Sequence, residues 1–226
     1  SSALILNTAA SNTAVGYNSL AANVTGANCT AIGTSSLAVN TVTGNCAVGY
    51  QSLFANTSGT GNTAIGTSAL AANITSNNNT AVGSSALILN TAASNTAVGY
   101  NALTTNVSGA NCTAVGTSAL AANTVSDNCA VGYQALTLNS TGTGNTAVGT
   151  SALAAITTAT SCTAVGASSL VINTGGSNTA VGFGTLALNV SGTGNTAIGT
   201  SALAANTTSN NVAVGTTAMQ TNTSGG

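Results

Sequence analysis

The stretch Asn12-Thr13-Ala14-Val15-Gly16 recurs with small changes along the whole chain and decides the fold. Successive copies begin 16 or 17 residues apart, and a repeat of that length is too short for a pair of helices, which needs roughly 33 to 47 residues. It fits one coil of a stacked β-structure, so we predict an all-β parallel β-solenoid of about 13 coils of 16 to 17 residues, with two short strands per coil. The glycine that ends each copy, here called the corner glycine, is Gly16, Gly33, Gly49, Gly66, Gly83, Gly99, Gly116, Gly132, Gly149, Gly166, Gly182, Gly199 or Gly215.

The coils are grouped in longer blocks. The spacing of the corner glycines runs 17, 16, 17, 17, 16 and then repeats, so five coils make a unit of 83 residues. The segment 1–18 recurs unchanged at 84–101, which indicates duplication of a whole block. We therefore predict a single repeat domain over 1–226, made of the blocks 1–83 and 84–166 and the partial block 167–226.

Side chains of one kind fall at fixed distances from the corner glycine. Val or Ile always precedes it, Leu or Met219 lies four residues after it, and Asn lies seven after it except at Ile156. Because side chains alternate across a strand, Val and the Thr two residues before it share a face, which we predict to be the interior. The expected interior and strand-end ladders are Val15, Ile32, Val48, Ile65, Leu20, Leu37, Leu53, Leu70, Asn23, Asn40, Asn56 and Asn73.

The alanine two residues before the corner glycine never varies in thirteen coils. On the orientation above it points outward and forms a smooth apolar strip. One interpretation is close packing against a neighbouring turn, and the other is docking of another chain, since exposed apolar strips mark interfaces. The expected interface strip includes Ala14, Ala31, Ala47, Ala64, Ala81 and Ala97.

We also predict the conformation of the turns between strands. The corner glycine allows a positive φ, and segments such as 57–61 absorb the one-residue difference in coil length. Asn side chains at the strand ends can bond along the stack.

The composition excludes several functions. The chain has no Lys, Arg or His, and Asp127 is its single charged side chain, so binding of nucleic acid and acid–base catalysis both lack their residues. Calcium needs several carboxylates and a metal site needs His or paired Cys, so we expect no metal, no cofactor and no enzyme. No apolar run is long enough to cross a membrane. Four sequons, which begin at Asn23, Asn73, Asn106 and Asn189, would permit N-glycans.

Five cysteines and five aromatic residues stand out in this chain. Cys29 and Cys46 are 17 residues apart, as are Cys112 and Cys129, but each pair should point to opposite faces, which opposes a disulfide. Buried thiols, intrachain disulfides and links between chains all remain open. An aromatic residue follows five corner glycines and either packs at the corner or binds sugar or a neighbouring rod. These residues are Tyr17, Tyr50, Tyr100, Tyr133 and Phe183.

The runs 12–20 and 62–70 resemble two related families, the head repeats of trimeric autotransporter adhesins and the repeats of phage-type tail fibres. The resemblance covers essentially the whole chain. It implies a left-handed parallel β-roll, often a homotrimer, on a cell or virion surface.

Three functions follow from these observations. The favoured one is an extracellular structural or adhesive fibre subunit that self-assembles through stacked coils, with itself as partner, as a homo-oligomer such as a trimer or as an end-to-end filament. The first alternative is a tail fibre that binds a receptor, glycans or a host surface. The second is an ice-binding solenoid, which would need regular rows of outward Thr.

Overall fold

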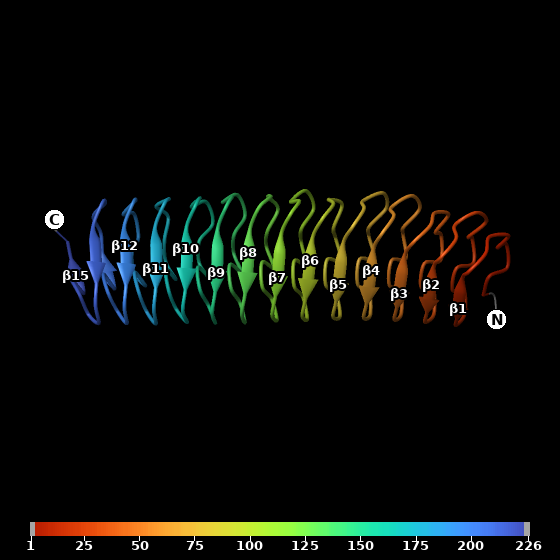
Figure 1. Ribbon diagram of the computed structural model, residues 1–226, viewed down its shortest axis with the longest axis horizontal. Coiled ribbons are helices and arrows are strands. Elements are labelled where there is room, and N and C mark those ends of the chain that lie inside the picture. Colours follow the sequence, from red (N-terminus) through yellow and green to blue (C-terminus); the bar gives the residue numbers. More distant parts are fainter. Residues whose placement is uncertain (1–2, 224–226) are drawn as a thin grey trace. The chain divides into compact units, whose positions relative to one another are not determined.

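The computed structural model describes residues 3–223. Its internal contacts divide the chain into two compact units, Ser1–Cys112 and Thr113–Gly226. The boundary falls inside the second 83-residue block, and the division into such blocks stays a prediction. In each unit the chain winds as a stack of coils, with one strand per coil before the corner glycine (Figure 1).

The strands are short because a turn follows each of them at once. The first unit holds β1 (Thr13–Val15), β2 (Thr30–Ile32), β3 (Cys46–Val48), β4 (Thr63–Ile65), β5 (Thr80–Val82) and β6 (Thr96–Val98). The second holds β7 (Thr113–Val115), β8 (Cys129–Val131), β9 (Thr146–Val148), β10 (Thr163–Val165), β11 (Thr179–Val181), β12 (Thr196–Ile198), β13 (Ala205–Asn206), β14 (Val212–Val214) and β15 (Thr221–Asn222).

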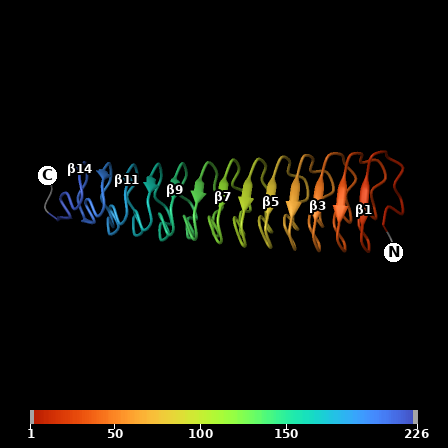
Figure 2. The same cartoon turned by 60° about the horizontal axis from the view of Figure 1, so that its bottom comes forward.

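Neighbouring strands within each unit pair in parallel and in register. In the first unit Thr13 pairs with Thr30 and Ala14 with Ala31, and the second unit repeats this register. Like residues therefore stack over like residues, and Figure 2 shows the strands of each unit following one another in chain order. No helix is assigned between residues 3 and 223. The predicted parallel β-solenoid is confirmed.

Within residues 3–223, the second strand predicted for each coil forms only at β13 and β15. Elsewhere two tight turns follow the corner glycine, as where the Ser19 N–H donates to the Gly16 carbonyl at 3.5 Å. Asn18 and Leu20 both have positive φ, 55° and 48°, which is incompatible with an extended strand. The two turns place Ser19 and Leu20, which are consecutive, in the interior together.

The leucine four residues after the corner glycine is buried and adopts the left-handed backbone conformation in all twelve coils that have it. Leu20, Leu37, Leu53 and Leu70 are 0% exposed, as predicted, with φ near 50°. Only Leu and Met occupy this position, although Ile and Val would be as apolar. A β-branched side chain is strongly disfavoured at positive φ, which explains why they are missing.

We predict that Leu136→Ile lowers the free energy of unfolding by about 2 kcal/mol, beyond the small cost of a volume-conserving exchange. Leu136 has φ 51°, and the added β-branch clashes with its own backbone there. Leu136→Met is the matched control, because Met219 occupies the same position at φ 47°. Urea denaturation measures both variants, and equal losses would contradict the conformational explanation.

The orientation predicted for the strands is wrong. Ala31, Ala47, Ala64, Ala81 and Ala97 are 0% exposed, and Ala14, in the first coil, is half-buried. The ladder residues Val15, Ile32 and Ile65 are 58%, 39% and 41% exposed, and Val48 is half-buried. The alanines therefore face the interior, and the valines and isoleucines face outward.

The width of the coil explains this reversal. Leucine from the turns already fills the interior from the opposite side, so the strand can contribute only a methyl group. Larger residues two positions after the leucine also lie outside, with Leu89 46% and Leu138 50% exposed. The invariant alanine is thus a packing requirement, because a larger side chain would overpack the coil.

Candidate functional site

An apolar surface runs along the outer face of the strands in each unit. We call it the outer strip and define it as the residues one and three before each corner glycine. Its apolar row is Val15, Ile32, Val48, Ile65, Val82 and Val98 in the first unit, and Val115, Val131, Val148, Val165, Val181, Ile198 and Val214 in the second. Eleven of these thirteen side chains are more than a third exposed, and the other two, Val48 and Val82, are half-buried.

A second row on the outer strip consists of hydroxyl groups. Thr30, Thr63 and Thr80 lie on the same face as the Val and Ile row and are half-buried. The hydroxyls of these three residues accept and donate no hydrogen bond among residues 3–223. Sequence reasoning placed this row inside the coil, and the structure places it on the surface. Cys46, Cys129 and Val212 stand in for Thr in their coils.

The asparagines seven residues after the corner glycine form buried ladders, as predicted. Asn23, Asn40, Asn56 and Asn73 are 0% exposed. The Asn56 amide donates to Asn40 Oδ1 at 2.9 Å, and the Asn73 amide donates to Asn56 Oδ1 at 3.0 Å. Each amide thus links one coil to the coil before it. Ile156, which is also fully buried, cannot make this bond.

The same asparagines absorb the difference in coil length. In a 17-residue coil the amide donates to the carbonyl three residues on, as from Asn56 to Gly59 at 2.9 Å. In a 16-residue coil it donates to the carbonyl two residues on, as from Asn40 to Val42 at 2.7 Å. The extra residue therefore lies directly after this asparagine, within the predicted turn, and the hydrogen bond is kept.

A second buried column, four residues before the corner glycine, bonds forward along the stack. Asn45 Nδ2 donates to Asn40 Oδ1 at 3.1 Å and to the Gly59 carbonyl at 2.7 Å. Asn45 Oδ1 accepts the backbone N–H of Asn62 at 2.9 Å. One side chain thus satisfies groups in two coils, which binds the stack together without any ion pair.

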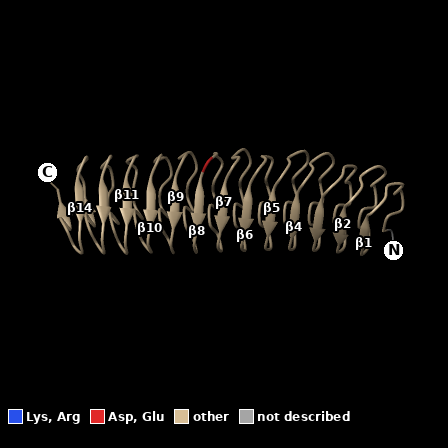
Figure 3. Cartoon of the chain, in the orientation of Figure 1, with Lys and Arg blue, Asp and Glu red and all other residues tan. Residues whose placement is uncertain are grey.

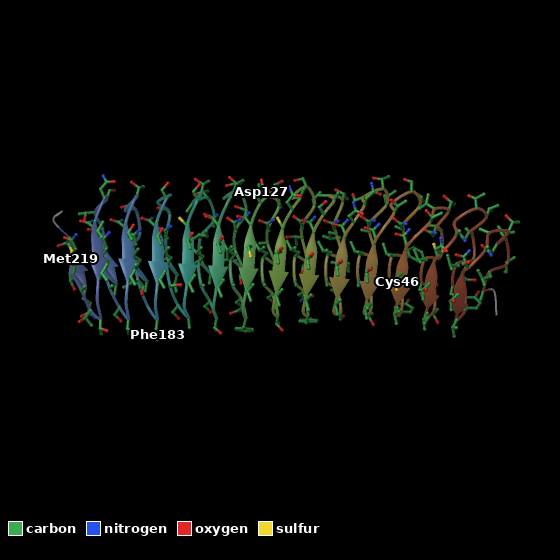
Figure 4. The ribbon with its side chains drawn as sticks, viewed as in Figure 1. Cys46, Asp127, Phe183 and Met219 are labelled. Atoms are coloured by element: carbon green, nitrogen blue, oxygen red, sulfur yellow. The ribbon has the colours of Figure 1, made fainter. Side chains whose placement is uncertain are left out.

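Cysteine replaces asparagine in this column at Cys29, Cys112 and Cys162. All five cysteines are free thiols, so the structure contains no disulfide among residues 3–223. Cys162 Sγ donates to the Gly175 carbonyl at 3.4 Å, as the asparagines of this column donate to the next coil, and it accepts from Asn173 Nδ2 at 3.5 Å. Burial raises the pKa of the Cys162 thiol, while hydrogen bonds from Asn178 and Asn173 partly offset this. Cys29 and Cys46 point to opposite faces, as predicted. The faces are the reverse of those predicted, because Cys29 is buried and Cys46, labelled in Figure 4, lies on the outer strip.

Each of these three cysteines precedes a 16-residue coil, where the next carbonyl lies 13 rather than 14 residues ahead. Two asparagines of this column also precede a 16-residue coil: Asn195 Nδ2 donates to the Thr208 carbonyl at 2.9 Å, whereas Asn79 Nδ2 is buried without a hydrogen-bond partner. A buried unsatisfied donor costs about 1 to 3 kcal/mol.

We predict that Asn79→Cys costs about 1 to 3 kcal/mol less stability than Asn62→Cys, because only the first exchange removes an unsatisfied donor, while both weaken the hydrogen bond that the side-chain oxygen accepts from the next coil. Asn62→Cys is the control, since the Asn62 amide donates to the Ser76 carbonyl at 2.8 Å and its loss should destabilise. Thermal unfolding under reducing conditions compares the two. A larger loss for Asn79→Cys than for Asn62→Cys would refute the explanation.

The remaining motifs do not form a site. Asn23, Asn73, Asn106 and Asn189, which begin the four sequons, are 0% exposed, so a glycan on any of them is incompatible with the fold. Asp127 lies in the turn before β8 with φ 64°, at a position that Asn, Gly or Ser occupies in other coils (Figure 3). Over residues 3–223 no group of three potential metal ligands occurs, and no helix there could cross a membrane.

The outer strip is therefore the surface that sequence reasoning missed. The invariant alanine could have revealed this orientation from the sequence, because it indicates a position that accepts no larger side chain.

Comparison of the chain with protein-family models, with curated proteins and with solved structures gives no match.

Proposed function

We propose that the chain is a structural subunit of an extracellular fibre and that the outer strip packs against other copies of the same chain. The observation that carries this proposal is the row of exposed Val and Ile side chains, which recurs once per coil in both units. Extended apolar rows on a surface favour burial by a partner. The resemblance to adhesin heads and tail fibres favours three copies and an external surface.

Self-association suits the chemistry of the strip. Each coil presents the same residues, so one copy offers another a regular, matching surface. Covering the exposed third of one Val side chain contributes on the order of 0.5 to 1 kcal/mol, and the contributions add along the row. The absence of Lys and Arg removes charge repulsion between like surfaces.

The mass of the native protein tests this proposal. We expect a multiple of the 21.2 kDa chain by light scattering after gel filtration at micromolar concentration. Val148→Lys combined with Val181→Lys places two charges on the outer strip and should give a monomer that still folds, since both side chains point outward. Thr143→Lys, in an exposed turn, is the matched control and should keep the native mass. A native protein that remains monomeric at all concentrations would refute the proposal.

A second candidate function, ice binding, is favoured by the outward Thr row. The sequence-based orientation placed this row inside the coil, which counted against ice binding, and the structure removes that objection. Hydroxyl and methyl groups alternate across the strip and repeat along it at roughly 4.8 Å, the strand spacing. A regular uncharged array of this kind can order water in a repeating pattern.

Thermal hysteresis separates the two functions. An ice-binding chain would be monomeric and would depress the freezing point below the melting point, and Thr163→Lys would abolish the effect. A self-associated chain would cover the strip and show none. The measurement therefore decides between the two functions on the same protein sample.

A further inference from the structure

A row of aromatic side chains lies on the coil corners, across the corner glycine from the outer strip. In the first unit Tyr17, Tyr50 and Tyr100 are 59%, 51% and 56% exposed, and in the second Tyr133 and Phe183 are 52% and 61% exposed. Figure 4 shows Phe183 at this corner of the second unit, at the edge opposite Asp127. More than half of each of these side chains is exposed to solvent, so packing at the corner uses only part of the ring surface.

Each tyrosine is followed by a side-chain amide. The pairs are Tyr17-Asn18, Tyr50-Gln51, Tyr100-Asn101 and Tyr133-Gln134. Where the first position holds Thr, the second holds Ser in every coil but the last, as in Thr67-Ser68. Gln51 and Ser68 have nearly the same φ, 53° and 56°, so the backbone does not explain the change from Ser to an amide. The side-chain amide therefore occurs where the preceding residue is tyrosine.

The polar groups of these pairs are available to a ligand. The side-chain amides of Asn18, Gln51, Asn101 and Gln134 make no hydrogen bond with any residue in the range 3–223, and neither do the four phenol hydroxyls. This contrasts with the buried asparagines, whose amides are bonded along the stack. Each pair therefore presents an exposed aromatic face beside a free donor and acceptor.

We propose that each Tyr–amide pair binds one sugar unit of a neutral glycan. The ring face stacks on the apolar face of a pyranose, and the amide bonds its hydroxyl groups. The chain has no Lys or Arg to pair with a carboxylate or sulfate, so the glycan is uncharged. Tyr17 and Tyr50 lie two coils apart, roughly 10 Å, so an extended chain can occupy both pairs and gain avidity. The proposal does not depend on self-association through the outer strip.

Immobilised oligosaccharides test this inference. The probes are chitin-, cello-, manno- and xylo-oligosaccharides, with sialylated and sulfated glycans for comparison, and the readout is biolayer interferometry on the full chain. We expect at least one neutral series to bind. Tyr50→Thr with Gln51→Ser, which copies the Thr67-Ser68 pair, should lower its affinity about tenfold, and the same exchange at all four pairs should abolish binding.

The variants are designed to fold, because Thr-Ser is native at this position in other coils. Circular dichroism and thermal unfolding should match the wild type, so a loss of binding reports the site. Phe183→Thr, which removes a ring that has no amide beside it, should change the affinity less than twofold. Absence of neutral binding below about 1 mM, preference for charged glycans, or unchanged affinity in the four-pair variant would overturn the inference.

Discussion

Gly132→Ala is expected to lower the free energy of unfolding by at least about 3 kcal/mol. We also expect the second unit of the variant to unfold in two steps instead of one. Gly132 has φ +138°, a conformation that only glycine adopts readily, and a Cβ there would lie 2.5 Å from the Gly149 carbonyl oxygen. The corner glycines stack directly over one another, so the backbone cannot move aside without displacing the next coil. Guanidinium denaturation followed by far-UV circular dichroism measures the loss.

Gly44→Asn is the matched control for this prediction. Gly44 also has a positive φ, +73°, but a Cβ there meets nothing within 4 Å. Asn28 and Asn78 occupy the equivalent turn position with φ 56° and 58°. We expect a change below about 0.5 kcal/mol. A similar loss at both glycines would show that close stacking is not what fixes the corner.

Asn45→Asp is expected to destabilise the first unit by about 3 to 5 kcal/mol at neutral pH. Asn45 is 1% exposed, and the whole chain contains no Lys, Arg or His to pair with a buried carboxylate. The carboxylate would also lose the two amide hydrogen bonds that Asn45 donates. Asn78→Asp, at the exposed turn position where Asp127 is native, should be close to neutral.

The pH dependence of Asn45→Asp has a definite sign. Burial raises the pKa of the introduced carboxyl above its unfolded value of about 3.9, so the unfolded state loses its proton first. Stability is therefore greatest below about pH 4 and falls as the pH rises through the folded pKa. Denaturation of the variant and the wild type between pH 3 and pH 8 measures this. A variant that becomes more stable as the pH rises would contradict the buried position of Asn45.

The period of the sequence was sufficient to predict how the coils stack. The corner glycines, the buried Leu20 column and the Asn23 ladder were predicted from repetition, because stacking in register turns each repeated position into a column. The place of the length variation was also predictable, since turn residues such as Gly59 gather there. None of this needed knowledge of which strand face is buried.

The orientation of the strand could not be predicted from hydrophobicity. Alternation allows two answers for Ala14 and Val15, and the larger apolar residue is the usual choice for the interior. The width of the coil depends on the left-handed backbone conformation of Leu20. Residue preferences do not predict this conformation, because leucine seldom adopts it. The same conformation removes the predicted second strand. The candidate site followed the orientation and was therefore assigned to alanine instead of Thr, Val and Ile.

Thiol reactivity tests most directly whether the outer strip faces outward. A short maleimide pulse on the native protein at low concentration, read by peptide mass spectrometry, should label Cys46 and Cys129, which replace Thr on the strip. The buried thiols of Cys29, Cys112 and Cys162 should react only after unfolding. Labelling of Cys29 or Cys112 ahead of Cys46 and Cys129 would contradict the orientation of the strands and, with it, the proposed interaction surface.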